Sequence, residues 1–492
     1  MSTHTAHFVA EWNPTGLAWE DITPYVEAVE GNFESAGRGN GAGFGDSSDA
    51  RSTLRVAPRL ASPTLDLSTW SRVPVRVQFT RDAFTARGVA GLIIDMNGDT
   101  ARTSFEIAGW QWLIRRVRAY SPLFERRPIA TKTTALSIED PTNPSYAAGP
   151  LNWIMWQAGG RPLEQAATYT SAPFYYSLDQ GLIAPRYSWS AGEDAWDEAL
   201  KLVRAAGGQL YQRPDGVIKF VSPLSIAGGS PQFAFTPSTY GKWPTRRGTA
   251  GEVVSSYNCT YIPRSVRMVD TIVEDREIRV VKAGAVIEVI LEPQYPIASL
   301  ETTASGLLHP EAISATFYDG TPVPQGAGGY THEVYTAAQR IQIFIQSAAS
   351  QPFVVERITL RGAPIVPGEP GVVTVGSGDP VLTIEPNPDI QSEADARRLC
   401  RMAIDFYGVE RPVITLPEVA YNPELQLGIA GTVTIPEWDL DTAPCVIVNM
   451  RHDANGKRSQ VDVVVTTGLP TLNDYFVISA ASQAGQTKRI GY

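Results

Sequence analysis

Ala195-Trp-Asp-Glu-Ala-Leu-Lys-Leu-Val203 is followed, in this 492-residue chain, by Gly207-Gly-Gln-Leu-Tyr211 and Asp215-Gly-Val-Ile-Lys-Phe220. The first stretch predicts a short helix, and the glycine pair that opens the second predicts where this helix ends. The remaining residues predict two short strands joined by a turn at Pro214-Asp-Gly216. A helix that leads into a hairpin is therefore the local unit from which we start.

This helix has a predicted buried face and a predicted cap. Trp196, Leu200 and Val203 recur at helical spacing and predict the apolar stripe. Ser190 and Glu193 have the spacing of a capping box, in which each residue satisfies a free backbone N–H of the other. We therefore expect the helix to begin just after Ser190.

Two further helices follow the same pattern. One ends at Gly159-Gly160, and the other begins at a capping box of Ser392 and Asp395 and ends before Gly408. After the second helix, a turn at 453–456 is expected to join two strands. The apolar faces consist of Leu151, Ile154, Met155 and Ala158 in the first helix, and of Ala396, Leu399, Cys400, Ala403 and Tyr407 in the second.

Alternating apolar and polar residues predict strands over most of the remaining chain. Asn97-Gly98 is typical of a hairpin turn, and the Gly-rich stretch 37–45 predicts a surface loop. We expect residues 353–360 to pair with the strand that contains Ile341, Ile343 and Ile345. Other alternating positions are Val75, Val77 and Phe79; Phe105 and Ile107; and Tyr257, Cys259 and Tyr261.

The composition agrees with a turn-rich β protein. The chain has 42 Gly and 37 Pro, 43% hydrophobic residues and only 19% charged residues. Its length requires several domains. The predicted fold class is thus mainly β with a few short helices, that is, a β-rich α+β multidomain protein. The net charge of −10 disfavours binding to duplex DNA, whereas an acidic wall would let a polyanion slide past.

The three cysteines Cys259, Cys400 and Cys445 are far apart in sequence and odd in number. They predict buried thiols of a protein that folds in a reducing cytosol. The first residues lack the features of a signal peptide, and no apolar run reaches the roughly 18 residues of a membrane-spanning helix. We therefore expect no membrane insertion.

Motifs for metal chemistry are incomplete. Asp95, Asn97, Asp99 and Glu106 stand where a calcium loop has ligands, but Thr100 replaces the required glycine, so a solvated hairpin tip is favoured. We accordingly predict no metal site there.

Motifs for other catalytic chemistry are equally incomplete. Residues 37–42 match a dinucleotide-binding motif by letter, but no helical pattern follows them. His332-Glu333 begins a zinc-protease motif in which Thr336 replaces the second ligand. Four acids are expected mostly on the exposed face of the first helix, where a structural role is favoured over glycoside hydrolysis: Glu193, Asp194, Asp197 and Glu198. We predict no enzyme, no catalytic, cofactor-binding or metal-binding residue, and no cofactor.

One dense basic cluster consists of Arg115, Arg116, Arg118, Arg126 and Arg127. Two interpretations stay open: an exposed connection between domains that makes ion pairs, and a contact between subunits with an acidic neighbour. Trp153 and Trp156 are expected in a core or an interface rather than as sugar platforms.

Five segments in order carry a resemblance to a known family. They are Asp21-Ile-Thr-Pro-Tyr-Val26; Ala50-Arg-Ser-Thr-Leu54 with Val73-Pro-Val-Arg-Val77; residues 195–211; residues 215–220; and Ile390-Gln-Ser-Glu-Ala-Asp-Ala396 with Gly428-Ile-Ala-Gly-Thr-Val433. In this order they resemble the tail hub and tail-tip (baseplate hub-like) proteins of tailed phages. One departure is that the glycine-containing turn after the third strand is here Ala86-Arg-Gly88.

The resemblance implies two tail-tube-like β-barrel domains and mixed α/β hub domains in each subunit. It implies a homotrimeric ring at the tail tip of the virion, made in the host cytoplasm, which caps the tail tube, adapts sixfold to threefold symmetry and forms part of the DNA exit channel. The implied partners are a distal tail or tail-tube protein, the tape measure protein, downstream tip or fibre proteins, and DNA that passes without sequence-specific binding. Two alternatives stay open: a tail protein that binds host-surface carbohydrate, and a tail-associated cell-wall hydrolase.

The expected domains follow the changes in pattern along the chain. They are an N-terminal tube-like β-barrel (1–120), a mixed α+β hub domain (121–224), a second tube-like β domain (225–378), a helix-plus-β domain (379–470) and a C-terminal arm (471–492).

Overall fold

A computed structural model gives the fold. It describes residues 6–13, 20–34, 51–58, 66, 68, 70–81, 84–98, 101–133, 148–168, 172–213, 215–222, 231–247, 254–304, 306–379, 381–408, 413–420, 425, 429–452 and 458–466. The predicted loop at 37–45, the turn at 453–456 and the arm at 471–492 lie outside these residues.

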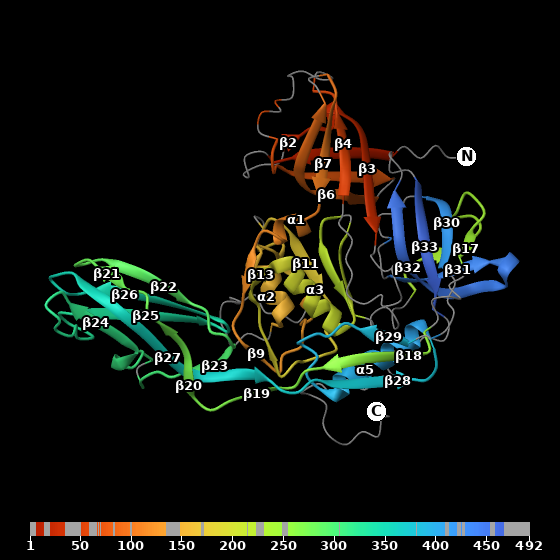
Figure 1. The fold of residues 1–492 in the computed structure, drawn as a ribbon. Helices are drawn as coiled ribbons and strands as arrows, with labels where there is room; N and C mark the ends of the chain where they lie inside the picture. Colours follow the sequence, from red (N-terminus) through yellow and green to blue (C-terminus); the bar gives the residue numbers. More distant parts are fainter. Residues whose placement is uncertain are drawn as a thin grey trace.

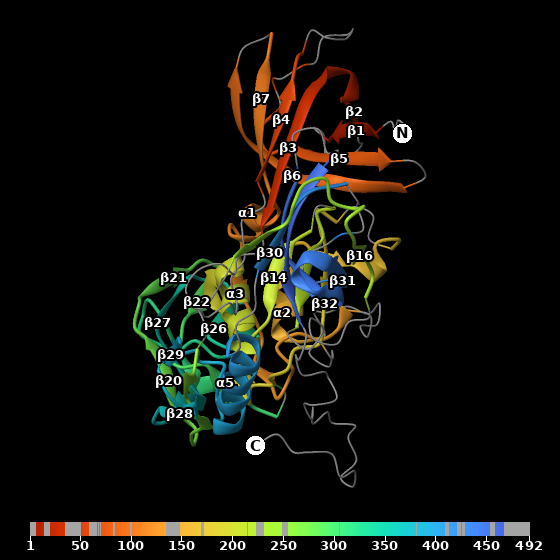
Figure 2. The same ribbon diagram turned by 90° about the vertical axis from the view of Figure 1, so that its right-hand side faces the viewer.

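The protein is mainly β, with short helices, and it is built from several packing units (Figures 1 and 2). The predicted fold class is confirmed. Two curled sheets, the N-terminal and C-terminal half-barrels, lie beside a central hub that carries the helices. A separate inserted β domain extends from the hub to the left in Figure 1. Among the described residues, no helix has the length and apolar character needed to cross a membrane.

The N-terminal half-barrel has the strand order β3-β4-β7-β6-β5-β1-β2. Side chains from alternate positions form its own apolar core, which includes Trp12, Val75 and Phe105. The predicted hairpin is confirmed, because β6 pairs with β7, but its turn is not at Asn97-Gly98: these two residues are still paired, with Ser104 and Thr103. The strands are β1 (Ala6–Trp12), β2 (Glu20–Asp21), β3 (Val26–Glu34), β4 (Arg51–Val56), β5 (Pro74–Arg81), β6 (Phe84–Gly98) and β7 (Thr103–Ala108).

The turn expected at residues 86–88 is not a turn. Strand β6 passes through these residues, and the hairpin to β5 closes between Arg81 and Phe84. The register passes from Val77 opposite Val89 to Gln78 opposite Arg87. Gly88 therefore has no partner residue and forms a β-bulge, a position that suits glycine.

The C-terminal half-barrel collects strands from two distant parts of the chain. β16 (Ala234–Phe235) and β17 (Thr245–Arg247) join β30 (Val413–Ala420), β31 (Ala430–Ile435), β32 (Leu440–His452) and β33 (Arg458–Val465). Their shared core includes Ile414, Val433 and Val463. The strand pairing thus crosses the expected boundary at 378, while the domain boundaries themselves stay predictions.

The hub packs its helices against small sheets around one large core, which includes Met155, Trp196 and Cys400. The three predicted helices are confirmed as α2 (Pro150–Gln157), α3 (Ala195–Ala206) and α5 (Glu393–Tyr407), and the predicted hairpin as β14 (Gln209–Gln212) with β15 (Ile218–Val221). The other elements are α1 (Gln111–Ile114), β8 (Arg118–Tyr120), β9 (Phe124–Glu125), β10 (Arg161–Pro162), β11 (Tyr175–Leu178), β12 (Tyr187–Ser188), β13 (Ala191–Asp194), β18 (Ser256–Tyr261), β28 (Gly371–Gly376) and β29 (Val381–Ile384).

The inserted β domain stacks two sheets on a core that includes Ile343, Phe353 and Ile358. The pairing expected for residues 353–360 is wrong: β27 pairs with β19, β20, β21, β23 and β24, whereas β26 lies between β22 and β25. Alternating apolar residues show which side of a strand is buried, but they do not show which strand pairs with it. The strands are β19 (Arg264–Val266), β20 (Asp270–Asp275), β21 (Arg279–Val281), β22 (Val286–Leu291), β23 (Ile297–Leu300), β24 (Ile313–Phe317), β25 (Tyr330–Ala337), β26 (Arg340–Ser347) and β27 (Phe353–Pro367).

Candidate functional site: the joined half-barrels and the polar junction

The two half-barrels are joined by backbone pairing. β3 lies antiparallel to β32, with Asn32 opposite Arg451, Phe33 opposite Met450 and Glu34 opposite Asn449. This seam makes one 13-stranded sheet of the described strands, although each half keeps its own apolar core. One chain therefore presents two curled sheets side by side.

One end of the joined sheet is acidic. Its last strand is β2, where Glu20 and Asp21 are both exposed. Glu20 stands opposite the buried Trp12 and accepts a hydrogen bond from its indole Nε1 at 3.1 Å. Opposite residues of an antiparallel pair point to the same face. Glu20 therefore lies on the core side of the sheet, at its open edge.

The opposite end of the main strand path is basic and carries an exposed aromatic ring. Its last strand is β17, where the exposed Arg246 stands opposite the buried Ile414. Trp243, just before this strand, is 70% exposed. Lys242 contacts Glu418 at 2.7 Å, and the hydrogen bond from this ammonium is the main reason why the pKa of Glu418 is lowered.

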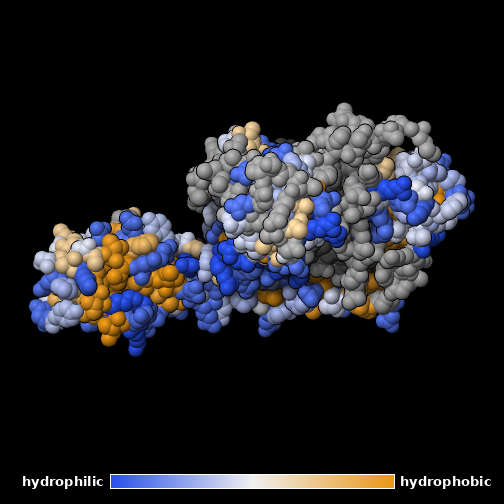
Figure 3. Space-filling view, turned by 90° about the horizontal axis from the view of Figure 1, so that it is seen from above, coloured by the Kyte–Doolittle hydropathy of each residue, from blue (hydrophilic) through white to orange (hydrophobic). Residues whose placement is uncertain are grey.

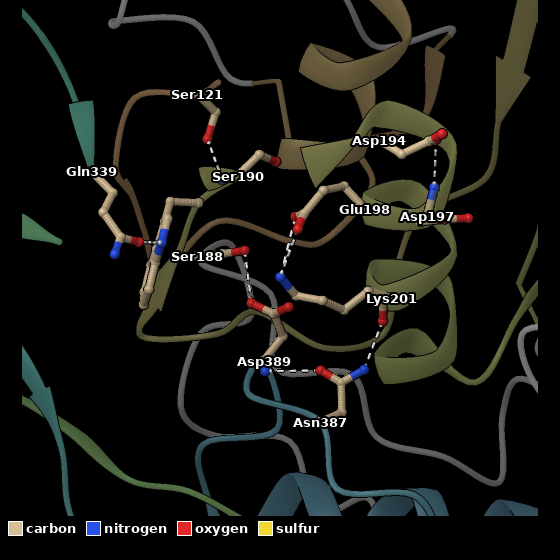
Figure 4. A network of polar contacts seen from close by, with 11 residues as sticks. Ser121, Ser188, Ser190, Asp194, Asp197, Glu198, Lys201, Gln339, Asn387 and Asp389 are labelled. Atoms are coloured by element: carbon tan, nitrogen blue, oxygen red, sulfur yellow. Dashed lines mark hydrogen bonds and ion pairs between the residues drawn. The ribbon is translucent and has the colours of Figure 1, made fainter. Parts of the chain in front are cut away.

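A buried polar junction fastens the segment before α5 to the hub (Figure 4). Ser188 Oγ donates to Asp389 Oδ1 at 2.8 Å, and Asn387 Nδ2 donates to the carbonyl of Lys201 at 2.7 Å. Asn387 Oδ1 also accepts from the backbone N–H of Asp389 at 2.9 Å. This junction fixes the segment between β29 and α5, which follows the inserted domain in the chain. No sequence motif indicated it.

Glu198 is a buried acid of this junction, as is Asp389. Its carboxylate accepts two hydrogen bonds of 3.1 Å from Lys201 Nζ. Burial raises the pKa of Glu198, and the attraction of Lys201 opposes that rise. The prediction of an exposed face is therefore wrong for Glu198, which is 1% exposed, whereas Glu193 and Asp197 are exposed as expected.

The predicted capping box of α3 is wrong as well. The cap is Asp194, whose Oδ1 accepts from the backbone N–H groups of Trp196 and Asp197 at 2.9 and 3.3 Å. Ser190 lies before β13, and its N–H donates to Ser121 Oγ at 2.8 Å. Because residues 191–194 pair with β8, the helix starts later than the spacing suggested. The predicted cap at Ser392 is confirmed: its Oγ accepts from Asp395 N–H at 3.1 Å. The Asp395 carboxylate accepts from the Ser392 hydroxyl at 2.7 Å.

Of the residues considered for metal or catalytic chemistry, those that the structure describes do not form one cluster. Asp95 and Glu106 face each other across β6 and β7, while Asp99 and Thr100 lie outside the described residues. His332 is buried on β25, where its Nε2 accepts from the Leu308 N–H at 3.0 Å and burial lowers the pKa of its imidazole. In the described part of the chain, no group of three or more His, Cys, Asp or Glu residues could hold a metal ion.

The basic cluster is largely exposed, and three of its members contact other residues of the hub. Arg115 Nη1 lies 3.2 Å from Asp197 Oδ1, and Arg116 Cζ lies 3.7 Å from the ring centroid of Trp112. Arg118 Nη1 donates to the Gly192 carbonyl at 3.4 Å. The ion pair of Arg115 agrees with the first of the two interpretations, and the contact between subunits stays a prediction.

The two tryptophans of α2 are half-buried and pack within the hub. Trp153 Nε1 donates to the Tyr120 carbonyl at 3.2 Å, and Arg161 lies 3.7 Å from the ring centroid of Trp156. All three cysteines are buried, as predicted, and burial raises the pKa of Cys445 to about 12.

The inserted domain exposes an apolar face, which Figure 3 shows from above. Exposed apolar residues of this domain include Ile278, Val280, Val286 and Ile290. On the sheet β22-β26-β25, Phe344 lies between Glu288 and Glu333, and the next row holds Ile290, Gln342 and Tyr335. The rings of Tyr335 and Phe344 meet edge to face at 5.8 Å.

The resemblance to phage tail proteins is also found among solved structures. The 43 kDa tail protein of prophage MuSo2 from Shewanella oneidensis is 8% identical, with 94% of this chain and 99% of that chain covered and a TM-score of 0.45. A tail protein from Neisseria meningitidis is also 8% identical, with coverage of 94% and 97% and a TM-score of 0.43. The prophage tail protein gp18 from Listeria monocytogenes is 9% identical, with coverage of 93% and 94% and a TM-score of 0.40.

No protein-family model and no curated protein matches the chain. All three TM-scores are below 0.5.

Proposed function

We propose that this chain is a structural, non-enzymatic phage tail protein, a hub or tip subunit that forms a trimeric ring at the end of the tail tube. The observation that carries the proposal is the 13-stranded sheet, in which one chain holds two curled modules joined at the β3–β32 seam. Three copies would place six modules around one axis. Such a ring matches a sixfold tube on one side and a threefold tip on the other.

The charge of the chain suits a channel for DNA. A trimer would carry a formal charge of −30, three times the −10 of one chain. A polyanion is repelled by acidic walls and would slide rather than bind. In this arrangement the ring would contact a distal tail or tail-tube protein and the tape measure protein on one side, and tip or fibre proteins on the other.

The test is the mass and symmetry of the assembled protein. Native mass spectrometry of the full chain should give a species of about 160 kDa, three times 53.4 kDa. Electron microscopy of the same sample should show threefold particles with six similar modules around a central opening. A chain that stays monomeric at high concentration, alone and with its tail-tube partner, would contradict the proposal.

A second candidate function, carbohydrate binding, is favoured by the exposed face of the inserted domain. Tyr335 is 56% exposed and its hydroxyl donates to Glu333 at 3.0 Å, beside Glu288 and Gln342. An aromatic ring flanked by polar acceptors and donors is the chemistry of a sugar platform. Glycan-array binding by the full chain that is lost in Tyr335→Ala, but kept in the control Tyr318→Ala, would support it. An array without binding would exclude it.

A further inference from the structure

Two ends of the joined sheet carry opposite charges. Among the described strands, the main hydrogen-bonded path runs from β2 to β17, and a branch through β31 ends at the uncharged β16. β2 presents Glu20 and Asp21, and β17 presents Arg246. Both Glu20 and Arg246 lie on the core side, because their opposite residues are the buried Trp12 and Ile414. The two ends are therefore alike in geometry and opposite in sign.

Charged residues on edge strands usually prevent association, since they keep an open edge from pairing with another chain. That protection works when both edges carry charge of the same sign. Here an acidic edge and a basic edge stand on one molecule, so contact between the two ends of different copies is attractive. Opposite signs thus favour a head-to-tail contact and disfavour contact between like ends.

We propose that the β2 end of one copy docks against the β17 end of a second copy, with Glu20 facing Arg246 across the contact. This inference rests on the proposed function and names the surfaces through which the ring would close. A head-to-tail contact forms a closed ring when its rotation is a simple fraction of a turn. The side chain of Trp243, 70% exposed beside Arg246, supplies apolar area at the same end.

The proposed contact continues each core into its neighbour. Trp12 ends the apolar core of the N-terminal half-barrel at the acidic edge, and Ile414 lies beside the basic edge in the core of the C-terminal half-barrel. When the edges meet, the charge pair lies between these two cores and is shielded from water on one side. A partly buried pair of this kind strengthens attraction and penalises like charges more than an exposed pair does.

The test uses charge reversal in the full chain. The single variants Glu20→Lys and Arg246→Glu each place like charges at the contact, and the double variant Glu20→Lys/Arg246→Glu restores opposite signs. Light scattering and native mass spectrometry over a dilution series give the concentration at which half of the protein is trimeric. We expect each single variant to raise this half-trimer concentration at least about tenfold. The double variant should return it to within about threefold of the wild-type value.

The control variants are Arg276→Glu and Glu385→Lys, whose side chains are 76% and 84% exposed and lie away from the two sheet ends. They should leave the trimer unchanged, and circular dichroism should show all variants folded. A trimer that is insensitive to the single reversals, or that the double variant does not recover, overturns this contact while the trimeric hub stands. A wild-type chain that never forms a trimer overturns both proposals.

Discussion

Gln391 holds the backbone of Tyr187 as a neighbouring strand would. Its side-chain Oε1 accepts from the Tyr187 N–H at 3.0 Å, and its Nε2 donates to the Tyr187 carbonyl at 2.5 Å. The two residues are 204 positions apart and both are buried. One amide therefore satisfies two buried backbone groups that have to be paired in a folded protein.

Replacing this amide should loosen the polar junction. Gln391→Leu keeps a similar volume but leaves the N–H and carbonyl of Tyr187 without this partner, which we expect to cost about 2–4 kcal/mol. Hydrogen exchange followed by mass spectrometry should show faster exchange of the Tyr187 amide. The matched control is Gln346→Leu, at an exposed position of β26. Equal protection in wild type and Gln391→Leu would contradict this role.

The start of α3 can be tested with two neighbouring substitutions. Asp194→Ala removes the acceptor of two helix N–H groups and should lower the free energy of unfolding by about 1 kcal/mol. Ser190→Ala should change it by less than about 0.5 kcal/mol, because within the described structure its hydroxyl has no hydrogen-bond partner. Urea unfolding monitored by tryptophan fluorescence measures both. A larger loss of stability in Ser190→Ala than in Asp194→Ala would support the capping box that the sequence spacing suggested.

These two residues show what the sequence could and could not predict. The apolar period of α3 and the left-handed Gly207 at its end are local features, and the helix was predicted from them. The position of the cap was not, because residues 191–194 pair with β8, which is remote in sequence. A local spacing rule has no access to that pairing.

The same limit applies to the site. Alternation predicted most strands but not that β3 and β32, more than 400 positions apart, would join two half-barrels. The junction residues Asn387 and Asp389 follow no periodic pattern, and their partners on the hub are about 200 positions away. Opposite charges at the ends of a sheet become visible only when the strand order is known.

Close packing of β6 against β7 gives a further prediction. A Cβ on Gly91 would stand 2.1 Å from the carbonyl oxygen of Ala108, which belongs to the backbone and cannot rotate away. Gly91→Ala should therefore lower the free energy of unfolding of the N-terminal half-barrel by about 1–3 kcal/mol. In the control Gly368→Ala the new Cβ meets Pro263 at 3.5 Å, an ordinary contact. Similar urea midpoints for the two variants would show that the strands can separate without cost.

Glu198 predicts how the stability of the hub depends on pH. Because burial raises its pKa above the ordinary value of 4.5, the folded state keeps this proton to higher pH than the unfolded chain does. The stability that Glu198 contributes is therefore fully present below pH 4.5 and is lost as the pH rises through the raised pKa. Each unit of pKa difference corresponds to about 1.4 kcal/mol.

Glu198→Gln keeps the side chain neutral at every pH and removes this loss. The free energy of unfolding of Glu198→Gln minus that of the wild type should therefore increase between pH 4 and pH 8, as urea titrations at each pH would measure. In the chain that keeps Glu198, Lys201→Met should enlarge the loss of stability with rising pH. The reason is that the attraction of Lys201 opposes the rise in the pKa of Glu198. The free energy of unfolding of Glu198→Gln minus that of the wild type could instead stay constant or fall as the pH rises. That result would mean that ionising the Glu198 carboxyl in the folded hub has no cost.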